Sequence, residues 1–285
     1  MSDVDVPHET PLVSASVLLS SVVSQLDTSR PPSAEQLHQL QLVSRLLSGM
    51  DEYLDTVSSA APAVQQPLLR ATAEHDWASA WSRKQTLFEL SAAWSAGAYE
   101  GNFVGLLTRL TRAKKALEIG MFTGTTTVCI ANNLPRDGKV TALEIDPYLD
   151  TFTKPLFEQS GLGGKIDVKV GNAVDHLNQL ATNILSDEEA YDIIFIDADK
   201  PGYTTYFKTI LDKGLLKKDG LLVVDNTLYK GTPWTEGLVD QEVLKIGKQN
   251  ADAIKEFNQV VRQDSRVEVV VLPVRDGVSL IMRNE

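Results

Sequence analysis

Short apolar runs alternate with helix-length segments from Lys114 to about residue 226, and no other feature of the sequence constrains the fold as strongly. The runs are KKALEIG, KVTALEID, KIDVKVG, YDIIFIDAD and GLLVVDN, at residues 114–120, 139–146, 165–171, 191–199 and 220–226. Strands joined by crossover helices pair in parallel and carry helices on both faces of their sheet. The alternation therefore predicts a doubly wound α/β domain.

The chain ends on a different pattern, in which two apolar runs are almost contiguous. The runs VEVVVLPV and GVSLIMR, at residues 267–274 and 277–283, are separated by Arg275 and Asp276. A connection of two residues joins antiparallel strands, whereas a parallel pair needs a long crossover. We therefore expect an antiparallel hairpin at one edge of the sheet.

The residues before Lys114 are expected to be mainly helical. Pro31 and Pro32 separate a short apolar helix at 12–26 from a second helix, which the capping pair Ser33 and Gln36 opens. This second helix is predicted to end at about Gly49, and further helices are predicted over residues 51–59, 64–75 and 85–112. The chain then has three parts: a flexible or partner-covering segment at 1–35, a helical extension and cap at 36–112, and the α/β domain at 113–285.

Charge and cysteine content exclude several classes of protein. The formal net charge of −11 leaves no general basic surface for nucleic acid. The single cysteine, Cys129, excludes an intramolecular disulfide and fits a reducing compartment. No apolar run is long enough to span a membrane, and the N-terminus is acidic where a secretory signal is basic. We expect a soluble, cytoplasmic protein without a nucleic-acid or membrane partner.

A glycine-containing loop follows the first strand and an acidic residue ends the second. Gly120 and Gly124 lie in LEIGMFTGTTT, where glycine lets the backbone approach a ligand closely, although the glycines could also simply make a tight turn. The spacing is not that of a nicotinamide-binding loop. Glu144 can accept hydrogen bonds from both hydroxyls of a ribose. Asp146 and Pro147 make an ordinary helix start.

Acidic and amide side chains also end the fourth and fifth strands. Asp197 closes the fourth strand, and Asp225 and Asn226 close the fifth. Neighbouring strands lie about 5 Å apart, so these side chains can converge at the carboxyl edge of the sheet. Their oxygens suit Mg²⁺, Mn²⁺ or Ca²⁺ better than zinc. The alternatives are a capped turn at Asp225 and Asn226 and an ion pair between Asp197 and Lys200.

Five motifs occur in an order that resembles one family. EIGMFTG, ALEID, VGNA, FIDADK and VVDNTLYKG together resemble the S-adenosylmethionine-dependent and divalent-cation-dependent O-methyltransferases of the caffeoyl-CoA and catechol type, over about residues 90–283. The resemblance implies a Rossmann-like, seven-stranded sheet whose last hairpin reverses one strand. It also implies methylation of one hydroxyl of a small vicinal diol, either a catechol or a cyclic enediol.

The resemblance implies a role for individual residues. Glu118 and Gly120 lie along the methionine part of the cofactor, Glu144 binds its ribose, and Asn172 and Ala173 border its adenine. The full set of implied cofactor-binding residues is Ala96, Glu118, Gly120, Thr126, Glu144, Asn172, Ala173 and Asp197. The implied metal ligands are Asp197, Asp225 and Asn226. Ala96 departs from the family, in which threonine is common at this position, and the first 90 residues match only faintly.

Lys200 and Asp197 are the residues to which we assign catalysis. The methyl group of a sulfonium is already activated, so the enzyme must supply an oxygen nucleophile in line with the bond from sulfur to carbon. Lys200 follows Asp197 by three residues and can act as general base, unless it is an ordinary surface lysine. Asp199 is expected to support the site without binding the metal directly.

The acceptor is expected to contact aromatic residues. Trp94, Tyr229 and Trp234 are the candidates, although each could instead pack its own loop. Two other classes of function compete with this hypothesis: a tRNA-modifying methyltransferase on the same scaffold, which the net charge disfavours, and a non-catalytic cofactor-binding protein. A homodimer is expected because the resembled family commonly forms dimers and the segment 12–26 is apolar.

Overall fold

The computed structural model describes residues 11–27, 29–235 and 247–284. These form two compact units, Met1–Ala60 and Ala61–Glu285. Within the described residues, no helix is long and apolar enough to cross a membrane.

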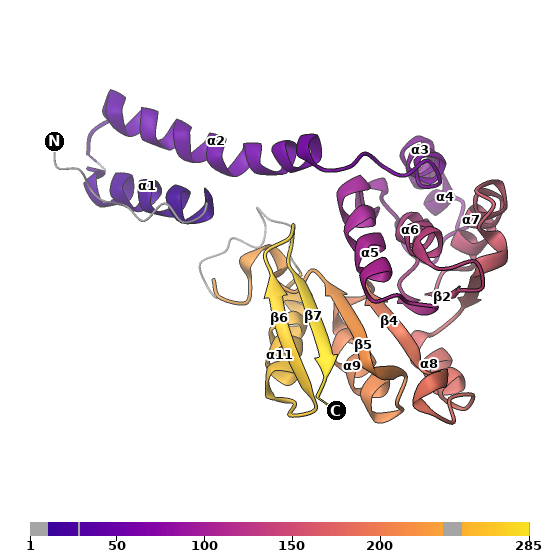
Figure 1. Ribbon diagram of the computed structural model, residues 1–285. Helices are drawn as coiled ribbons and strands as arrows, with labels where there is room; N and C mark the ends of the chain where they lie inside the picture. The colour runs from indigo at the N-terminus through magenta and orange to yellow at the C-terminus, as the bar shows by residue number, and fades with distance from the viewer. Residues whose placement is uncertain (1–10, 28, 236–246, 285) are drawn as a thin grey trace. The chain divides into compact units, whose positions relative to one another are not determined.

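The first unit is a pair of helices, α1 (Pro11–Gln25) and α2 (Ala34–Val57), that lie side by side (Figure 1). The prediction of separate helices that end and restart near Gly49 is wrong, because α2 runs through this residue. A single glycine inside a helix costs only about 1 kcal/mol, and no proline interrupts this stretch.

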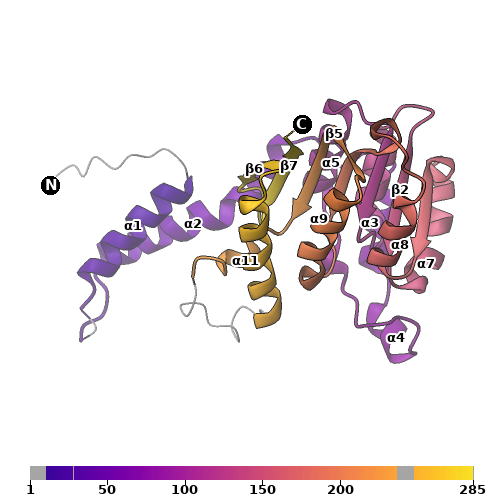
Figure 2. The same ribbon diagram turned by 90° about the horizontal axis from the view of Figure 1, so that it is seen from below.

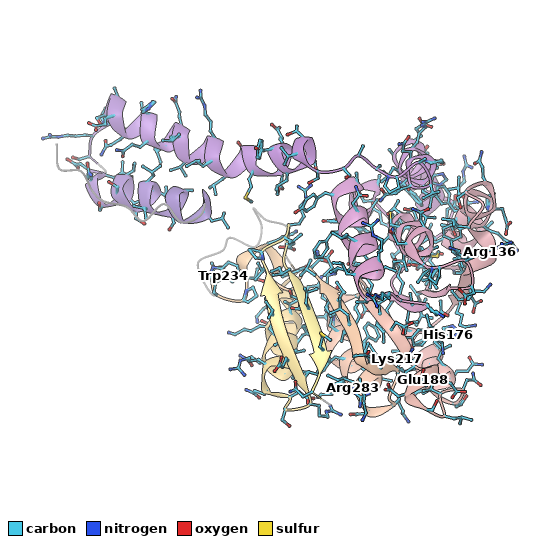
Figure 3. All side chains as sticks on the ribbon, in the orientation of Figure 1. Arg136, His176, Glu188, Lys217, Trp234 and Arg283 are labelled. Atoms are coloured by element: carbon cyan, nitrogen blue, oxygen red, sulfur yellow. The ribbon has the colours of Figure 1, made fainter. Side chains whose placement is uncertain are left out.

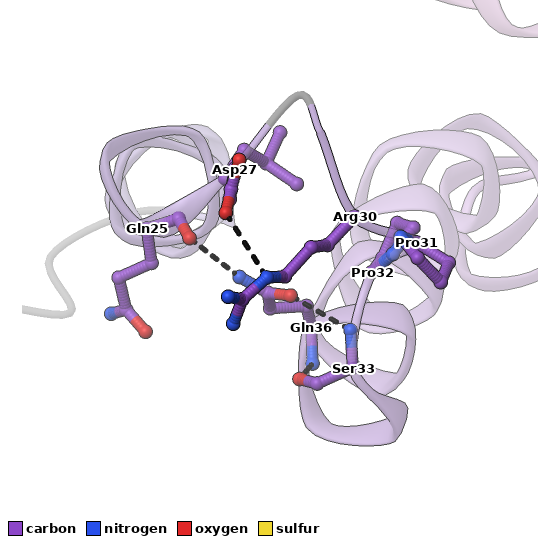
Figure 4. Close-up of a pocket in the computed structure, with 8 residues that line it drawn as sticks. Gln25, Asp27, Arg30, Pro31, Pro32, Ser33 and Gln36 are labelled. Carbon is purple, nitrogen blue, oxygen red and sulfur yellow. Dashed lines mark hydrogen bonds and ion pairs between the residues drawn. The ribbon is translucent and has the colours of Figure 1, made fainter.

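The turn between α1 and α2 is closed by side-chain hydrogen bonds (Figure 4). The predicted capping box is confirmed, since Gln36 N donates to Ser33 Oγ at 3.2 Å and Ser33 N donates to Gln36 Oε1 at 2.8 Å. The amide group of Gln36 also donates to the carbonyl of Gln25 at 3.0 Å. Gln36 therefore both caps α2 and connects it to the end of α1.

The second unit begins with short helices and continues as alternating strands and helices (Figures 1 and 2). Its α-helices are α3 (Gln66–Glu74), α4 (Trp77–Ser82), α5 (Ala98–Leu110), α6 (Thr125–Asn133), α7 (Pro147–Gln159), α8 (Ala173–Ala181), α9 (Tyr203–Asp212) and α11 (Lys248–Gln263). Its strands are β1 (Lys115–Ile119), β2 (Lys139–Glu144), β3 (Ile166–Val170), β4 (Tyr191–Ile196), β5 (Leu216–Asp225), β6 (Val267–Leu272) and β7 (Val278–Arg283).

The strands form one seven-stranded sheet in the order β3-β2-β1-β4-β5-β7-β6. Strands β1 to β5 pair in parallel, whereas β7 is antiparallel to both β5 and β6. The predicted fold class, including the antiparallel terminal hairpin, is confirmed. The order reverses between β1 and β4, which is where open α/β sheets bind ligands at the carboxyl ends of their strands.

Helices cover both faces of this sheet (Figure 2). Helices α8, α9 and α11 pack on one face, where Leu177, Phe207 and Phe257 are fully buried against the strands. Helices α5, α6 and α7 cover the other face through apolar side chains such as Val104, Ile130 and Leu149. Burial on both faces explains why β4 carries a continuous apolar run.

One predicted helix is shorter than expected. Instead of spanning residues 85–112, helix α5 begins at Ala98, and the preceding segment is irregular except for a 3₁₀ turn at Ala92–Trp94. The amide of Leu87 donates to Asp146 Oδ2 at 2.7 Å, so it is not available to a helical carbonyl. A contact between distant residues therefore overrides the local helix propensity.

Candidate active site

The glycine loop after β1 is shaped by two glycines in the left-handed region. Gly120 has φ 93° and Gly124 has φ 72°, and Gly124 is the N-cap of α6. A Cβ at Gly120 would collide with the backbone of Asp197 at the end of β4. Glycine is therefore required where the loop crosses the point at which the strand order reverses.

Glu144 ends β2 as a buried carboxylate that backbone amides hold. Phe122 N donates to its Oε2 at 2.8 Å and Asp146 N donates to its Oε1 at 2.9 Å. Burial raises the pKa of the Glu144 carboxyl, while these amides act in the opposite direction. The carboxylate is thus fixed in position at the carboxyl edge of the sheet.

Glu118 is a second buried carboxylate, one strand away. Its Oε2 accepts a hydrogen bond from Thr127 Oγ1 at 2.5 Å, whereas its Oε1 is buried and has no hydrogen-bond partner among the residues that the structure describes. Burial raises the pKa of Glu118 to about 8. Because a buried polar atom without a partner is costly, the site is suited to a ligand that donates a hydrogen bond or carries a positive charge.

The other predicted cofactor residues lie just before α5 and at the starts of α6 and α8. Thr126 is buried in the first turn of α6, and its neighbour Thr125 approaches Ser95 Oγ at 3.2 Å, next to Ala96. Asn172 is the N-cap of α8 and its Oδ1 accepts from Val174 N at 2.9 Å, so part of its side chain is already used. Ala173 is the first residue of α8.

At the ends of β4 and β5, three acceptor groups surround one ammonium group. Lys200 Nζ donates to Asp197 Oδ1 at 3.1 Å, to Asn226 Oδ1 at 2.6 Å and to Tyr203 Oη at 2.7 Å. Asp197 and Asn226 come from neighbouring parallel strands, as the pairing of β4 with β5 requires. The structure therefore brings Lys200 and two predicted metal ligands to one point.

Asp225 is more deeply buried than its neighbours in this group. Its Oδ1 accepts a hydrogen bond from Asn226 N at 2.7 Å. Its pKa is raised well above the ordinary value, first by burial and then by the carboxylates of Asp197 and Glu100. Like charges held together in a buried place favour a bound cation.

The composition of this group limits the metal that it could hold. No cluster of three or more histidine, cysteine, aspartate or glutamate residues suited to a metal occurs in the part of the chain that the structure describes. The group of Asp197, Asp225 and Asn226 has only two such residues and completes its oxygen set with an amide. A set of this kind fits a hard cation and not zinc.

Two tyrosines of α9 support the loop after β4. Tyr206 Oη donates to Asp199 Oδ1 at 2.5 Å, so Asp199 is bound by a side chain of the next helix. Tyr203 is fully buried and accepts the hydrogen bond from Lys200. Tyr203 is a contact of the site that was not predicted from the sequence, although its spacing of three residues from Lys200 would permit it.

The three aromatic candidates for acceptor binding differ in their surroundings. Tyr229 is buried, and its Oη accepts from Asn250 Nδ2 at 3.1 Å, which ties it to α11. Trp234 is 64% exposed and lies beyond β5 (Figure 3). Trp94 is 54% exposed, with its ring 6.1 Å from that of Phe122 in the glycine loop. Tyr229 is therefore held in the core next to α11, whereas both tryptophans have exposed surface.

The terminal hairpin contributes a contact that the sequence analysis missed. The turn between β6 and β7 binds the loop after Asn226, because Asp276 Oδ1 accepts from Lys230 N at 2.5 Å and its carbonyl accepts from Leu228 N at 2.9 Å. The dipeptide of Asp276 and Gly277 is a turn signal, but a turn signal does not reveal what the turn touches.

Ionic groups at the other end of the sheet have no part in this site. Lys217 pairs with Asp192 at 2.7 Å, and Arg283 donates to the carbonyl of Leu216 at 2.9 Å. Both lie at the end opposite the glycine loop (Figure 3).

The known sequences that this chain resembles are O-methyltransferases. A family model described as O-methyltransferase matches residues 71–284. Caffeoyl-CoA O-methyltransferase 2 of Eucalyptus globulus is 36% identical over 225 residues, which are 78% of this chain and 82% of that protein. Caffeoyl-CoA O-methyltransferase of Pinus taeda is 33% identical over 276 residues, covering 95% of this chain and 99% of that protein.

Solved structures share the fold. The methyltransferase PaMTH1 of Podospora anserina, solved with bound SAH, has a TM-score of 0.67 and 25% identity, and covers 91% of this chain and 100% of that chain. An O-methyltransferase of Bacillus cereus, also in complex with SAH, has a TM-score of 0.66 at 22% identity. The match covers 83% of this chain and 97% of that chain. The second likeness concerns the fold alone.

Proposed function

The chain belongs to the O-methyltransferase family, and from this premise we propose that it transfers the methyl group of S-adenosylmethionine to one hydroxyl of a small acceptor that carries two adjacent hydroxyls. The acceptor is a catechol or a cyclic enediol, and the reaction requires a divalent cation. The observation that carries this proposal is the convergence of Asp197, Asn226 and Lys200 beside two buried carboxylates.

The donor half of the proposal is supported by two carboxylates at the ends of neighbouring strands. The buried Glu118 Oε1, which no described residue contacts through a hydrogen bond, needs a donor, and the amino group of the methionine part supplies one. Glu144 stands at the end of the next strand, where it would accept the hydroxyls of the ribose. Together these two carboxylates would recognise the amino group and the ribose of a nucleoside that carries an amino acid.

The cation half is supported by the oxygen set of Asp197, Asp225 and Asn226. These residues would hold Mg²⁺, which would stabilise negative charge on the acceptor oxygen. Lys200 lies close enough to take the proton of the reacting hydroxyl.

The proposed reaction is a displacement at the methyl carbon. The acceptor oxygen forms a bond to this carbon while the bond from the carbon to the donor sulfur breaks, and its electron pair stays on sulfur. The hydroxyl proton passes to Lys200 Nζ, which accepts it as the neutral amine after it has released its own proton to solvent. The products are the methyl ether and S-adenosylhomocysteine. Burial of Glu118 and Glu144 fixes the donor, so that the methyl group can be held in line with the acceptor.

The direct test is an incubation of the full chain with labelled S-adenosylmethionine, a panel of catechols and cyclic enediols, and Mg²⁺. Turnover should stop with a chelator and return with added Mg²⁺. Asp225→Ala should lose this turnover while it keeps its affinity for S-adenosylhomocysteine. Turnover that persists in chelator would disprove the requirement for a cation, and equal loss of turnover and cofactor affinity would show that Asp225 has another role.

The competing functions are not favoured. The relatives are named O-methyltransferases, and the net charge of −11 opposes a tRNA substrate. Binding of labelled tRNA at physiological salt would reverse this conclusion.

We also propose a homodimer in which α1 and α2 meet a second copy. These helices expose apolar side chains, including Val23 at 58% and Val57 at 59%. A pair of helices rarely buries enough apolar surface to be stable alone. Light scattering on the full chain should give the mass of a dimer, and a monomer would contradict this assembly.

A further inference from the structure

Asp146 has more contacts than its position at the start of α7 requires. It is fully buried, and its Oδ1 accepts a hydrogen bond from Tyr148 N at 2.9 Å, which is the ordinary N-cap contact. Its Oδ2 accepts from Leu87 N at 2.7 Å, from a segment far upstream in the chain. An N-cap needs one oxygen, and serine or threonine would supply it. The second oxygen therefore serves another purpose.

The same residue is bonded to the carboxylate proposed to bind the ribose. Asp146 N donates to Glu144 Oε1 at 2.9 Å, and the other oxygen of Glu144 accepts from Phe122 N at 2.8 Å. A continuous series of hydrogen bonds thus runs from Leu87 through Asp146 and Glu144 to the glycine loop. The position of the upstream segment and that of the ribose carboxylate are therefore both set by Asp146, the first through its side chain and the second through its backbone amide.

Asp146 holds the segment of residues 84–95, and the C-terminal end of this segment contacts both the glycine loop and the start of α6. Ser95 Oγ lies 3.2 Å from Thr125 Oγ1 in the first turn of α6. Within the segment Leu90 is buried, whereas Trp94 is largely exposed and packs its ring 6.1 Å from Phe122. The segment, which we call the cap segment, therefore lies across the loop that would receive the donor.

We propose that Asp146 is a positioning residue for the donor site: it holds the cap segment against the glycine loop and thereby keeps the donor bound. This inference rests on the proposed function, because the donor is taken to be S-adenosylmethionine. Asp146 does not touch the donor in this proposal. Its side chain acts through Leu87, which fixes the cap segment, while its backbone amide, which every variant at this position keeps, orients the carboxylate of Glu144.

Asp146→Ser is the informative variant, because serine keeps the cap of α7 but cannot also reach Leu87 N. We expect amide hydrogen exchange in a peptide covering residues 85–90 to rise about 10-fold. We expect the Kd for S-adenosylhomocysteine to rise about 10-fold. The KM for the donor should rise likewise, while kcat at saturating donor stays within about threefold, a split that a general loss of folding would not produce.

Two further variants separate this role from a structural one. Leu87→Pro removes the same hydrogen bond from the exposed end, where the side chain is 57% exposed, and it should reproduce the effects of Asp146→Ser without touching α7. The double variant should add little to either single change. Asp76→Ser is the matched control, since Asp76 Oδ1 caps α4 by accepting from Ser79 N at 2.9 Å on the surface. In this control, the hydrogen exchange at residues 85–90 and the Kd for S-adenosylhomocysteine should both stay within about twofold of the unmodified chain.

The outcomes are distinguishable. Unchanged exchange at residues 85–90 in Asp146→Ser and Leu87→Pro would overturn the role of Asp146 in holding the cap segment. Faster exchange with unchanged binding of S-adenosylhomocysteine would overturn the link to the donor site. If the unmodified chain does not bind S-adenosylhomocysteine, the proposed function fails, whereas the exchange measurement still decides whether Asp146 holds the segment.

Discussion

The carboxyl edge of the sheet has two halves that are held in different ways. On the β1 and β2 side, Glu144 is bound by the backbone amides of Phe122 and Asp146. On the β4 and β5 side, Asp197 and Asn226 are bound by the side-chain ammonium of Lys200. We call these the donor half and the acceptor half, after the ligands proposed for each.

The two halves also differ in backbone strain. In the loop after β5, Asn226, Tyr229 and Lys230 all have positive φ, at 59°, 34° and 55°. In the glycine loop the left-handed positions fall on Gly120 and Gly124, where they cost little, and on Phe122. Non-glycine residues in this region are strained and persist only where other contacts hold them.

The difference indicates how each half meets its ligand. Backbone amides are part of the folded chain and cannot leave, so the donor half is already formed. An ammonium group on a flexible side chain can move away and be replaced by another cation. The following experiments therefore ask whether the two halves respond independently, beginning with the largest expected effect.

Replacing the ammonium should affect the acceptor half alone. Lys200→Met should lower kcat by about 10²- to 10⁴-fold, the range for loss of a general base. Affinity for S-adenosylhomocysteine, measured by calorimetry, should change by less than about twofold because the donor half is untouched. Retention of kcat in this variant would remove Lys200 from the reaction.

Changing the ribose carboxylate should have the opposite pattern. Glu144→Gln places an amide group against Phe122 N or Asp146 N, and one of these donors loses its acceptor. We expect the Kd for S-adenosylhomocysteine to rise about 10- to 100-fold, as for loss of a charged hydrogen bond. The concentration of Mg²⁺ that gives half-maximal activity should be unchanged, and a parallel shift would mean that the halves are coupled.

The donor half should also make stability depend on pH. The pKa of Glu118 is raised by burial from 4.5 to about 8, so the folded state binds a proton more tightly than the unfolded state. This contribution to stability is full below pH 4.5 and is lost as the pH rises through about 8. The free energy of unfolding should therefore fall across this window by up to about 1.4 kcal/mol per pH unit.

Urea denaturation at several pH values measures this dependence. Glu118→Gln should flatten it, because glutamine does not titrate. Saturating S-adenosylhomocysteine should flatten it as well, since its amino group would favour the ionised carboxylate. An unchanged slope in Glu118→Gln would assign the titration to another group.

The smallest effect is expected from the turn that binds the strained loop. Asp276→Ala removes the acceptor of Lys230 N and should lower the free energy of unfolding by about 1 kcal/mol. The KM for the acceptor should rise a few-fold with donor affinity unchanged, whereas Asp276→Asn keeps an acceptor oxygen and serves as the control. A change in donor affinity would contradict the separation of the two halves.

Much of the fold could be predicted because its signals are local. Each strand of the sheet is an apolar run bounded by turn residues, and the terminal hairpin follows from the two residues between its strands. One exception has a cause that is not local. The helix expected from residue 85 begins only after Gly97, because Leu87 is bound by Asp146, and no window around residue 87 contains that information.

In the candidate site, too, some features follow from the sequence and others only from the tertiary structure. The sequence alone determined that Asp197, Asp225 and Asn226 stand at the ends of paired strands, because strand periodicity and parallel topology bring such ends to one edge. Only the tertiary structure decided that Tyr203 accepts from Lys200, that Asp276 holds Lys230 and that Asp146 holds Leu87. These contacts depend on packing between elements, and the residue types on either side do not specify which partner comes within hydrogen-bonding distance.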